Sequence, residues 1–363
     1  MSFSGYRYKF NYLYYAQNKE KVSLIGLCLD ELRSLSEQIG DKTFRGQQLF
    51  DWIYRKNIDD HNLMTNLPGT FITKLSEKYK FHPLVLAHCS ESKKEPTKKF
   101  LFRTENGHMI ESVLMHDGNR STVCLSTQVG CAVDCQFCAT AQMGFLKNLT
   151  AGEIIDQFIQ IRSIIEEPPI NVVFMGMGEP FLNYRSVIQA AELLHQPDGI
   201  NLGFDRITIS TVGIVPKIKR YTQEGHRYKL AISLNGVSQE QRSMIMPISK
   251  VHTLNDLLVA ARKYASISRR KLTIEYVLIE KLNDSPEDAK TLKRLLRDIR
   301  CKLNLIPYNE IGGPYRRPND DRINAFLAQL QNVSFPVTVR WSKGTDIDAG
   351  CGQLAIKENI IND

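Results

Sequence analysis

The spacing of hydrophobic and polar positions changes twice along the chain, near residues 82 and 120. In the first part, apolar residues recur every three or four positions within residues 29–39 and again within residues 44–53, which is the spacing of amphipathic helices. A further helix is expected to begin near Pro68. Residues 21–82 are therefore predicted to form a small helical unit of the helix-hairpin-helix kind.

Residues 83–120 show a different pattern, in which apolar and polar residues alternate. The pairs Asn106-Gly107 and Asp117-Gly118 interrupt this alternation, and such pairs favour the tight turns of β-hairpins. This part is predicted to form a short antiparallel β extension.

After Arg120, short apolar runs alternate with amphipathic segments such as 150–165 and 286–300. The predicted strands are 121–127, 170–178, 205–213, 228–236, 271–279, 302–309 and 337–341. Serial alternation of strands and helices predicts an α/β fold with a parallel sheet, in the form of a full or partial (β/α) barrel.

The chain of 363 residues is long enough for several such units, each with a core of its own. The predicted division is an N-terminal extension at 1–20, the helical unit at 21–82, the β extension at 83–120, the barrel at 121–357 and a tail at 358–363.

Composition is typical of a cytoplasmic globular protein. Apolar residues make up 42% and charged residues 24%, and no apolar run is long enough to span a bilayer, so no membrane partner is expected. The basic and aromatic N-terminal segment lacks the apolar stretch and the small-residue cleavage site of a signal peptide.

Net charge favours a polyanionic partner without identifying one. Lys and Arg outnumber Asp and Glu by 47 to 39, which gives a net charge of +8. A solvated surface explains each basic run equally well. The runs that can contact phosphate are Lys42, Arg45, Arg55 and Lys56 in the helical unit, then Lys93, Lys94, Lys98 and Lys99, then 269–271, Arg316 and Arg317.

Three of the eight cysteines have the close spacing Cys131-x3-Cys135-x2-Cys138, in the loop after the first predicted barrel strand. A structural zinc site needs a fourth ligand, which would have to come from far along the chain. A four-iron cluster held by three thiolates instead leaves one iron open to a small molecule. The remaining cysteines are too few for a disulfide framework.

Polar residues follow several apolar strands at their carboxyl ends, where barrel enzymes carry their active sites. They are the Gly178-Glu179 pair, Ser210, Ser233, Asn235 and Asn309. Each of them taken alone is explained equally well by turn or cap chemistry.

The CxxxCxxC spacing after the first strand resembles the radical S-adenosylmethionine (SAM) superfamily. Together with it, "FMGMGEP", "ITISTVGIVP", "SLN", "NLIPYN" and "GTDIDAGCGQL" are similar to motifs of the ribosomal RNA adenine-C2 methyltransferases, also called dual-specificity RNA methyltransferases. The resemblance extends from Lys21 to Lys357. It implies a partial barrel of the radical SAM type. It departs at Gly350, where the family usually has alanine.

The resemblance implies which residues hold the cofactors. Cys131, Cys135 and Cys138 would hold a [4Fe-4S] cluster whose open iron binds SAM. Gly178 and Glu179 would bind the SAM ammonium group. The remaining SAM contacts in the family match Ser210, Ser233, Leu234, Asn235 and Asn309.

The resemblance also implies the catalytic residues and the use of two SAM molecules per turnover. One SAM would methylate Cys351 to S-methylcysteine, and the second would yield a 5′-deoxyadenosyl radical. Cys124 would resolve the protein–RNA adduct through a transient disulfide with Cys351, and Glu111 would remove a proton. From the residues alone, Cys351 is equally well a small buried hydrophobe and Glu111 an outward-facing charge on a half-buried strand. Cys28, Cys89 and Cys301 match no role and are predicted to be packing residues.

The implied activity is methylation of C2 of an adenosine in 23S rRNA, and also in tRNA, with an electron donor such as flavodoxin or ferredoxin and a monomeric enzyme. Three alternatives stay open. One is the paralogue that methylates C8, although Pro180 after Gly-Glu favours C2. The others are a generic radical SAM enzyme acting on a small metabolite, and a non-catalytic iron–sulfur or zinc RNA-binding protein.

Overall fold

The computed structural model describes residues 21–166 and 169–356, so the predicted N-terminal extension and tail lie outside the described residues. The predicted helical unit is present, because leucines such as Leu32, Leu49 and Leu75 meet in a common core. Its elements are β1 (Val22–Ser23), α2 (Leu29–Gln38), α3 (Phe44–Phe50), the π-helical turn η1 (Asp51–Arg55), the 3-10 turn η2 (His61–Leu63), α4 (Gly69–Lys78) and β2 (Tyr79–Lys80).

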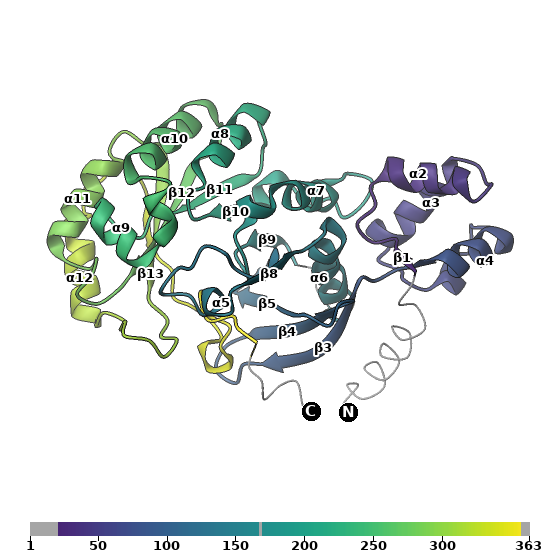
Figure 1. The fold of residues 1–363 in the computed structure, drawn as a ribbon, viewed down its shortest axis with the longest axis horizontal. Coiled ribbons are helices and arrows are strands. Elements are labelled where there is room, and N and C mark those ends of the chain that lie inside the picture. Colours follow the sequence, from purple (N-terminus) through teal and green to yellow (C-terminus); the bar gives the residue numbers. More distant parts are fainter. Residues whose placement is uncertain (1–20, 167–168, 357–363) are drawn as a thin grey trace.

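One ten-stranded sheet forms the centre of the molecule, with the strand order β14-β13-β12-β11-β10-β9-β6-β5-β4-β3 (Figure 1). The four strands at the β3 end of this order are antiparallel, each to the next: β3 (Leu84–Glu91), β4 (Thr97–Thr104), β5 (Met109–Asp117) and β6 (Arg120–Cys124). The others run parallel to β6: β9 (Asn171–Phe174), β10 (Ile207–Thr211), β11 (Lys229–Ser233), β12 (Leu272–Leu278), β13 (Cys301–Pro307) and β14 (Val337–Val339). The predicted alternation of strands is therefore confirmed.

Helices connect the parallel strands and cover the outer side of the sheet (Figure 1). Several begin at side-chain caps, as where Ser285 Oγ accepts from the backbone N–H of Asp288 at 3.1 Å. The helices are α6 (Ala151–Ser163), α7 (Tyr184–His195), α8 (Val215–Glu224), α9 (Gln239–Ile245), α10 (Leu254–Ile267), α11 (Pro286–Leu296) and α12 (Asp320–Gln329), with the 3-10 turns η3 (Pro180–Asn183), η4 (Phe204–Arg206), η5 (Pro247–Lys250) and η6 (Thr345–Ile347). No helix in the described ranges is long and apolar enough to cross a membrane.

The sheet does not close into a full barrel. At β6 it continues instead into the antiparallel strands, since β6 pairs with β9 on one side and β5 on the other. The predicted β extension thus shares its sheet with the barrel. A small hairpin of β7 (Gln128–Gly130) and β8 (Phe145–Asn148) lies in the loop after β6, and the short helix α5 (Ala139–Gln142) lies between its strands.

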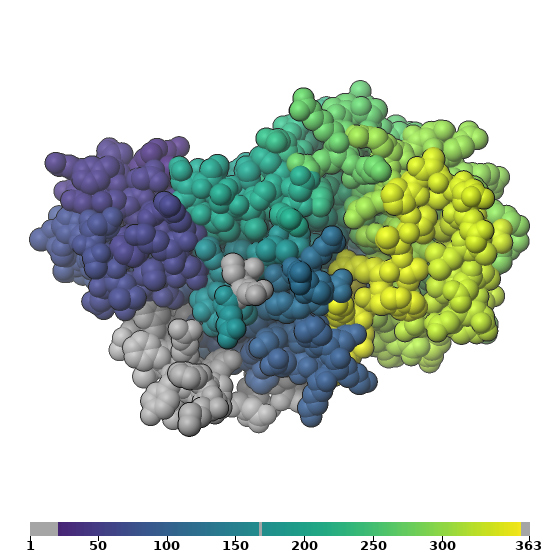
Figure 2. Space-filling model, turned by 180° about the vertical axis from the view of Figure 1, so that it is seen from behind, coloured from purple at the N-terminus to yellow at the C-terminus, as the bar shows by residue number. Residues whose placement is uncertain are grey.

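The helical unit docks on the amino end of α6 through a close backbone approach. A Cβ added to Gly152 would lie 2.5 Å from the carbonyl oxygen of Ile25, and Gly26 adopts φ +109° opposite it. Arg162 in α6 also donates to the backbone carbonyl of Tyr54 at 3.2 Å. Seen from behind, the helical unit forms a purple lobe against the teal part of the molecule (Figure 2).

Gly152→Ala is expected to destabilise the protein although alanine has the higher helix propensity, because the added methyl group collides with backbone rather than with a movable side chain. Overpacking of this kind costs about 1–3 kcal/mol, which denaturant unfolding would measure. Gly69→Ala is the matched control, since no atom lies within 4 Å of its added Cβ. Equal stability of both variants would contradict the close docking.

Candidate functional site

A cavity of about 160 Å³ lies at the carboxyl ends of the parallel strands. Its wall combines residues from most strands of the barrel with the cysteine loop and the C-terminal segment. The predicted residues that line it are Cys124, Cys131, Cys135, Cys138, Gly178, Glu179, Ser210, Ser233, Asn235, Asn309 and Cys351. Leu234 and Glu111 do not border the cavity.

The cysteine loop is held in place by backbone contacts on both of its sides. The N–H of Gln136 donates to the carbonyl of Ile245 at the end of α9 (2.9 Å), and the N–H of Cys131 donates to the carbonyl of Gly144 (2.9 Å). The Cys135 side chain packs in a small apolar cluster with Ile245. This loop therefore presents its three thiols to the cavity from a fixed backbone.

The three thiols suit an iron–sulfur cluster better than a single metal ion. Burial is the largest cause that raises the pKa of each thiol, to about 12 for Cys131, and Cys131 and Cys138 raise the pKa of Cys135 further. Bringing three thiolates together here needs a polycation between them. Within residues 21–166 and 169–356, no three His, Cys, Asp or Glu side chains are close enough to share one ion. In a cluster, by contrast, each thiolate binds a different iron.

Glu179 is a buried carboxylate held by backbone donors. It is 2% exposed, and its two oxygens accept from the N–H groups of Phe181 (2.9 Å) and Val212 (2.8 Å). Burial raises its pKa to about 7, against the effect of these hydrogen bonds. Gly178 at φ +96° allows a close approach to Gln128, since a Cβ added to Gly178 would lie 2.5 Å from the Cβ of Gln128. Such a carboxylate suits an ammonium partner.

Asn235 turns the chain after β11 and ties it to β12. It adopts φ 55°. Its Oδ1 accepts from the N–H of Val277 at 2.9 Å, and its carbonyl accepts from Asn283 Nδ2 at 2.9 Å. The Leu234 side chain is 1% exposed and packs in the core, so only its backbone remains for the predicted SAM contact.

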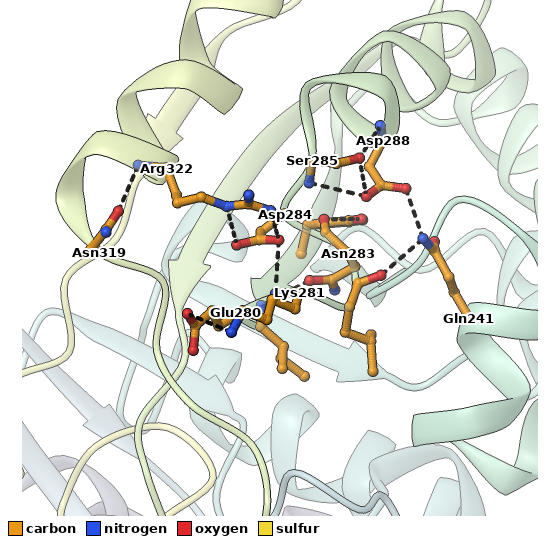
Figure 3. A network of polar contacts seen from close by, with 12 residues as sticks. Gln241, Glu280, Lys281, Asn283, Asp284, Ser285, Asp288, Asn319 and Arg322 are labelled. Carbon is orange, nitrogen blue, oxygen red and sulfur yellow. Dashed lines mark hydrogen bonds and ion pairs between the residues drawn. The ribbon is translucent and has the colours of Figure 1, made fainter.

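A buried polar network continues from Asn283 to the outer helices (Figure 3). Asp284, next in the chain, forms a two-pronged ion pair with Arg322 of α12, at 2.6 and 2.9 Å. Gln241 of α9 donates to Asp288 at 2.7 Å. The loop after β12 thereby fixes α9, α12 and the turn at Asn235 relative to one another, although no simple motif in the sequence marks this network.

The segment that carries Cys351 is fastened over the cavity on several sides. Asn309 Nδ2 donates to the carbonyl of Cys351 at 2.9 Å. The carbonyls of Gly352 and Leu354 accept from Ala139 N–H (2.7 Å) and Thr140 Oγ1 (2.6 Å) of α5. Asn309 is therefore a support of this segment, which sequence reasoning did not predict.

Cys124 and Cys351 face the same cavity. Cys124 ends β6 and is 8% exposed, while the exposed surface of Cys351 borders the cavity. Burial raises the pKa of Cys124 to about 12, with a further increase from Cys351 and a decrease from Arg340. Loss of water around the sulfur also raises the pKa of Cys351, and the charge of Arg340 lowers it. Arg340 borders the same cavity, and its charge favours the thiolate form of both cysteines.

Glu111 is buried rather than outward-facing, so that interpretation of its position is wrong. It is 1% exposed and pairs with Lys99 at 2.9 Å. Burial raises its pKa, and Lys99 lowers it. The backbone of Ala355 also lowers its pKa and the charge of Asp348 raises it, so the carboxylate lies near the segment that carries Cys351.

Several basic residues predicted to contact phosphate are buried or form ion pairs within the protein. Lys99 is 6% exposed, so burial removes it from the possible surface contacts. In the helical unit, Arg45 pairs with Asp41, and both Arg55 and Lys56 pair with Asp51.

Of the three cysteines without a role, Cys301 is buried, and Cys28 and Cys89 are half-buried against the core.

Sequence reasoning missed Glu275 and Arg340, two charged residues that border the cavity, and Arg242 of α9, which does not border it. Glu275 is 4% exposed and accepts from Asn304 Nδ2 at 3.0 Å. Glu275 lies two positions before the cavity-lining Val277 on β12, so both side chains point to the same face of the strand. This alternation is a signal in the sequence that could have identified Glu275. Arg242 is fully buried in α9; burial lowers its pKa to about 10, while Cys135 raises it.

Comparisons of the sequence identify related proteins over almost the whole chain. Residues 22–80 match the ribosomal RNA large subunit methyltransferase N-terminal domain, and residues 125–293 match the radical SAM superfamily. The chain is 41% identical to the dual-specificity RNA methyltransferase RlmN of Desulfotalea psychrophila, over 94% of this chain and 97% of that protein. It is 42% identical to a probable enzyme of the same name from Aquifex aeolicus, over 90% and 95%.

A solved structure shares the same fold. The crystal structure of a radical SAM methyltransferase from Sphaerobacter thermophilus matches with a TM-score of 0.88 and 42% identity, covering 92% of this chain and 99% of that one. The match extends beyond the barrel and therefore supports the arrangement of the whole described chain.

Glu179→Gln is expected to remove a pH dependence of stability. The pKa of Glu179 is about 7 in the folded protein against 4.5 for an exposed glutamate, so the folded state binds the extra proton between these values. The stability due to protonated Glu179 is fully present below the lower pKa and is lost as pH rises to the upper one, at roughly 1.4 kcal/mol per pH unit. Denaturant unfolding of the cluster-free protein at several pH values measures this loss.

Glu153→Gln is the matched control, because Glu153 is also buried but is held by Lys147 and the first turn of α6, outside the cavity. In Glu153→Gln, the free energy of unfolding should still fall with rising pH as it does in the wild type, because Glu179 is intact. Parallel curves for wild type and Glu179→Gln would contradict the shifted pKa.

Proposed function

Because the chain belongs to the family of dual-specificity RNA methyltransferases of the radical SAM type, we propose that it methylates C2 of an adenosine in RNA. The observation that carries this proposal is a single cavity bordered by the three-cysteine loop and by two further thiols, Cys124 and Cys351. A radical SAM enzyme without a methylated cysteine needs the first set but not the second.

The cluster and SAM have residues suited to hold them. Cys131, Cys135 and Cys138 would bind a [4Fe-4S] cluster, and the Glu179 carboxylate would bind the SAM ammonium group beside Gly178. Ser210, Ser233 and Asn235 would line the remainder of the SAM site, with the oxygen of Asn309. When bound, the reduced cluster supplies the electron that cleaves SAM to a 5′-deoxyadenosyl radical.

The two remaining thiols would carry the methyl group. The Cys351 thiolate attacks the methyl carbon of a first SAM and becomes S-methylcysteine, and a second SAM per turnover serves to activate that methyl group. Once its carbon is joined to C2, Glu111 would take the proton from C2, and the unpaired electron of the adduct would return to the oxidised cluster. The Cys124 thiolate then attacks the Cys351 sulfur, forming a disulfide. The carbon keeps the electron pair of the broken C–S bond and takes up a proton.

The proposed substrates are 23S rRNA and tRNA. Residues 22–80 match the ribosomal RNA large subunit methyltransferase N-terminal domain, and the relatives are named dual-specificity RNA methyltransferases. A target adenine must leave its stack to enter the cavity, which costs least in a loop. Trp341 follows the cavity residue Arg340, is 50% exposed and lies under the guanidinium of Arg317 at 4.7 Å. Such a pair offers a surface for a neighbouring base. We further propose a cytoplasmic monomer reduced by a flavodoxin or a ferredoxin.

Protein with a reconstituted cluster, given SAM, reductant and either RNA under anaerobic conditions, is expected to form 2-methyladenosine, measured by mass spectrometry of digested nucleosides. Cys351→Ala should lose the product because no carrier remains for the methyl group. Cys89→Ala, a half-buried cysteine outside the cavity, should keep it. Formation of 8-methyladenosine would instead identify a C8 enzyme, and 5′-deoxyadenosine without methylated RNA would exclude these substrates.

Cys124→Ala is expected to trap RNA covalently joined to Cys351, because the thiol that would break the C–S bond is missing. A denaturing gel with labelled RNA would show a band of protein-linked RNA that depends on SAM. The control is Cys301→Ala, which removes a buried thiol of β13 outside the cavity. Free 2-methyladenosine formed by Cys124→Ala at the wild-type rate would contradict this role.

A further inference from the structure

Arg242 in α9 is a fully buried cation, with 1% of its side chain exposed. Arginine is seldom buried without an acidic partner, because removing the charge from water costs several kcal/mol. Among the described residues, no Asp or Glu forms an ion pair with Arg242, whereas the buried Lys99 has one. Its charge is therefore not neutralised by the protein's carboxylates.

Backbone carbonyls satisfy most of its hydrogen bonds. Nη1 donates to the carbonyls of Ser233 and Leu234 at the end of β11, and Nη2 donates to Val212 after β10 at 3.2 Å. Nε is buried with no hydrogen-bond partner. Carbonyl dipoles stabilise a guanidinium but carry no net charge, so a negative group is still required nearby.

The negative group in reach of Arg242 is the cysteine loop. Cys135 packs in one apolar cluster with Ile245 and Met246, which follow Arg242 by three and four positions. The helix that carries Arg242 touches this loop directly, because Ile245 accepts from the N–H of Gln136 at 2.9 Å. Three thiolates with an iron–sulfur cluster form a net anion at this place.

Contacts of the neighbouring residues Gln241 and Gly236 also fix the position of Arg242. Its neighbour Gln241 donates to Asp288 Oδ1 (2.7 Å) and to the carbonyl of Leu282 (3.1 Å), within the network of Figure 3. Gly236 leaves room for the side chain, since a Cβ there would lie 3.1 Å from Arg242 Cγ. A charge held this rigidly acts on its surroundings without having to reorganise.

We propose that Arg242 is the counter-cation of the cluster and makes its reduction more favourable. Reduction adds one electron to a group that is already anionic. A fixed positive charge in a low-dielectric site stabilises the reduced form more than the oxidised form, which raises the reduction potential. Through its carbonyl contacts, Arg242 is at the same time a positioning residue for the ends of β10 and β11.

The test is a redox titration of the reconstituted protein, followed by the electron paramagnetic resonance signal of the reduced cluster. Arg242→Gln is expected to shift the midpoint potential to a lower value, because it keeps hydrogen-bond donors but removes the charge. Arg242→Lys keeps the charge and is expected to stay near the wild-type value. Arg162→Gln is the matched control: Arg162 also donates to backbone carbonyls, but in the contact with the helical unit.

An unchanged potential in Arg242→Gln, with iron content equal to wild type, would overturn the proposal, as would equal shifts in Arg242→Gln and Arg242→Lys. If Arg242→Gln fails to retain iron, retention by Arg242→Lys supports the counter-cation role and loss in both refutes it. The inference rests on the assignment of the cluster to Cys131, Cys135 and Cys138. A wild-type protein that yields no signal would refute that assignment first, and this inference with it.

Discussion

The pairing of β6 with a strand on each side is the contact on which the rest of the structure depends. On one side Cys124 lies opposite Val113 of β5, and on the other it pairs with Val173 of β9. The antiparallel strands and the parallel strands therefore share one hydrogen-bonded sheet. A slip of β6 by one residue would turn Cys124 away from the cavity, and it would also move the cysteine loop that follows.

A second constraint is electrostatic. The cavity gathers thiols and carboxylates from distant parts of the chain, and burial makes the charged form of each costly. The protein sets two arginines against this accumulation, Arg242 behind the cysteine loop and Arg340 beside Cys124 and Cys351. Burying these thiols and carboxylates together lowers the stability of the cofactor-free protein, although the proposed chemistry needs them in one place. Binding of the cluster and SAM would compensate part of this cost.

Much of the fold could be predicted from the hydrophobic pattern. The helices bury one apolar face, whereas the parallel strands form short apolar runs buried on both faces, as from Leu272 to Leu278. The cavity residues near motifs were predicted too, since strand ends collect them. Burial of Lys99 and Glu111 could not be predicted, because a strand covered on both faces shows no difference between its two sides. The contact of Asn283 with Asn235 joins residues 48 positions apart, and no local pattern records it.

The C-terminal segment shows why the site had to be built from such distant contacts. The proposed mechanism requires Cys351 to lie near both the cysteine loop and Cys124, and a free loop would spend most of its time elsewhere. Instead, Asn309 and α5 hold the carbonyls around Cys351, while the side chain borders open space. Backbone anchoring leaves the sulfur free to change its bonding. In the proposed mechanism the Cys351 sulfur would carry in turn a methyl group, a nucleobase and a second sulfur. Such a thiol needs this combination, since each state has a different size and none can rely on contacts to the sulfur itself.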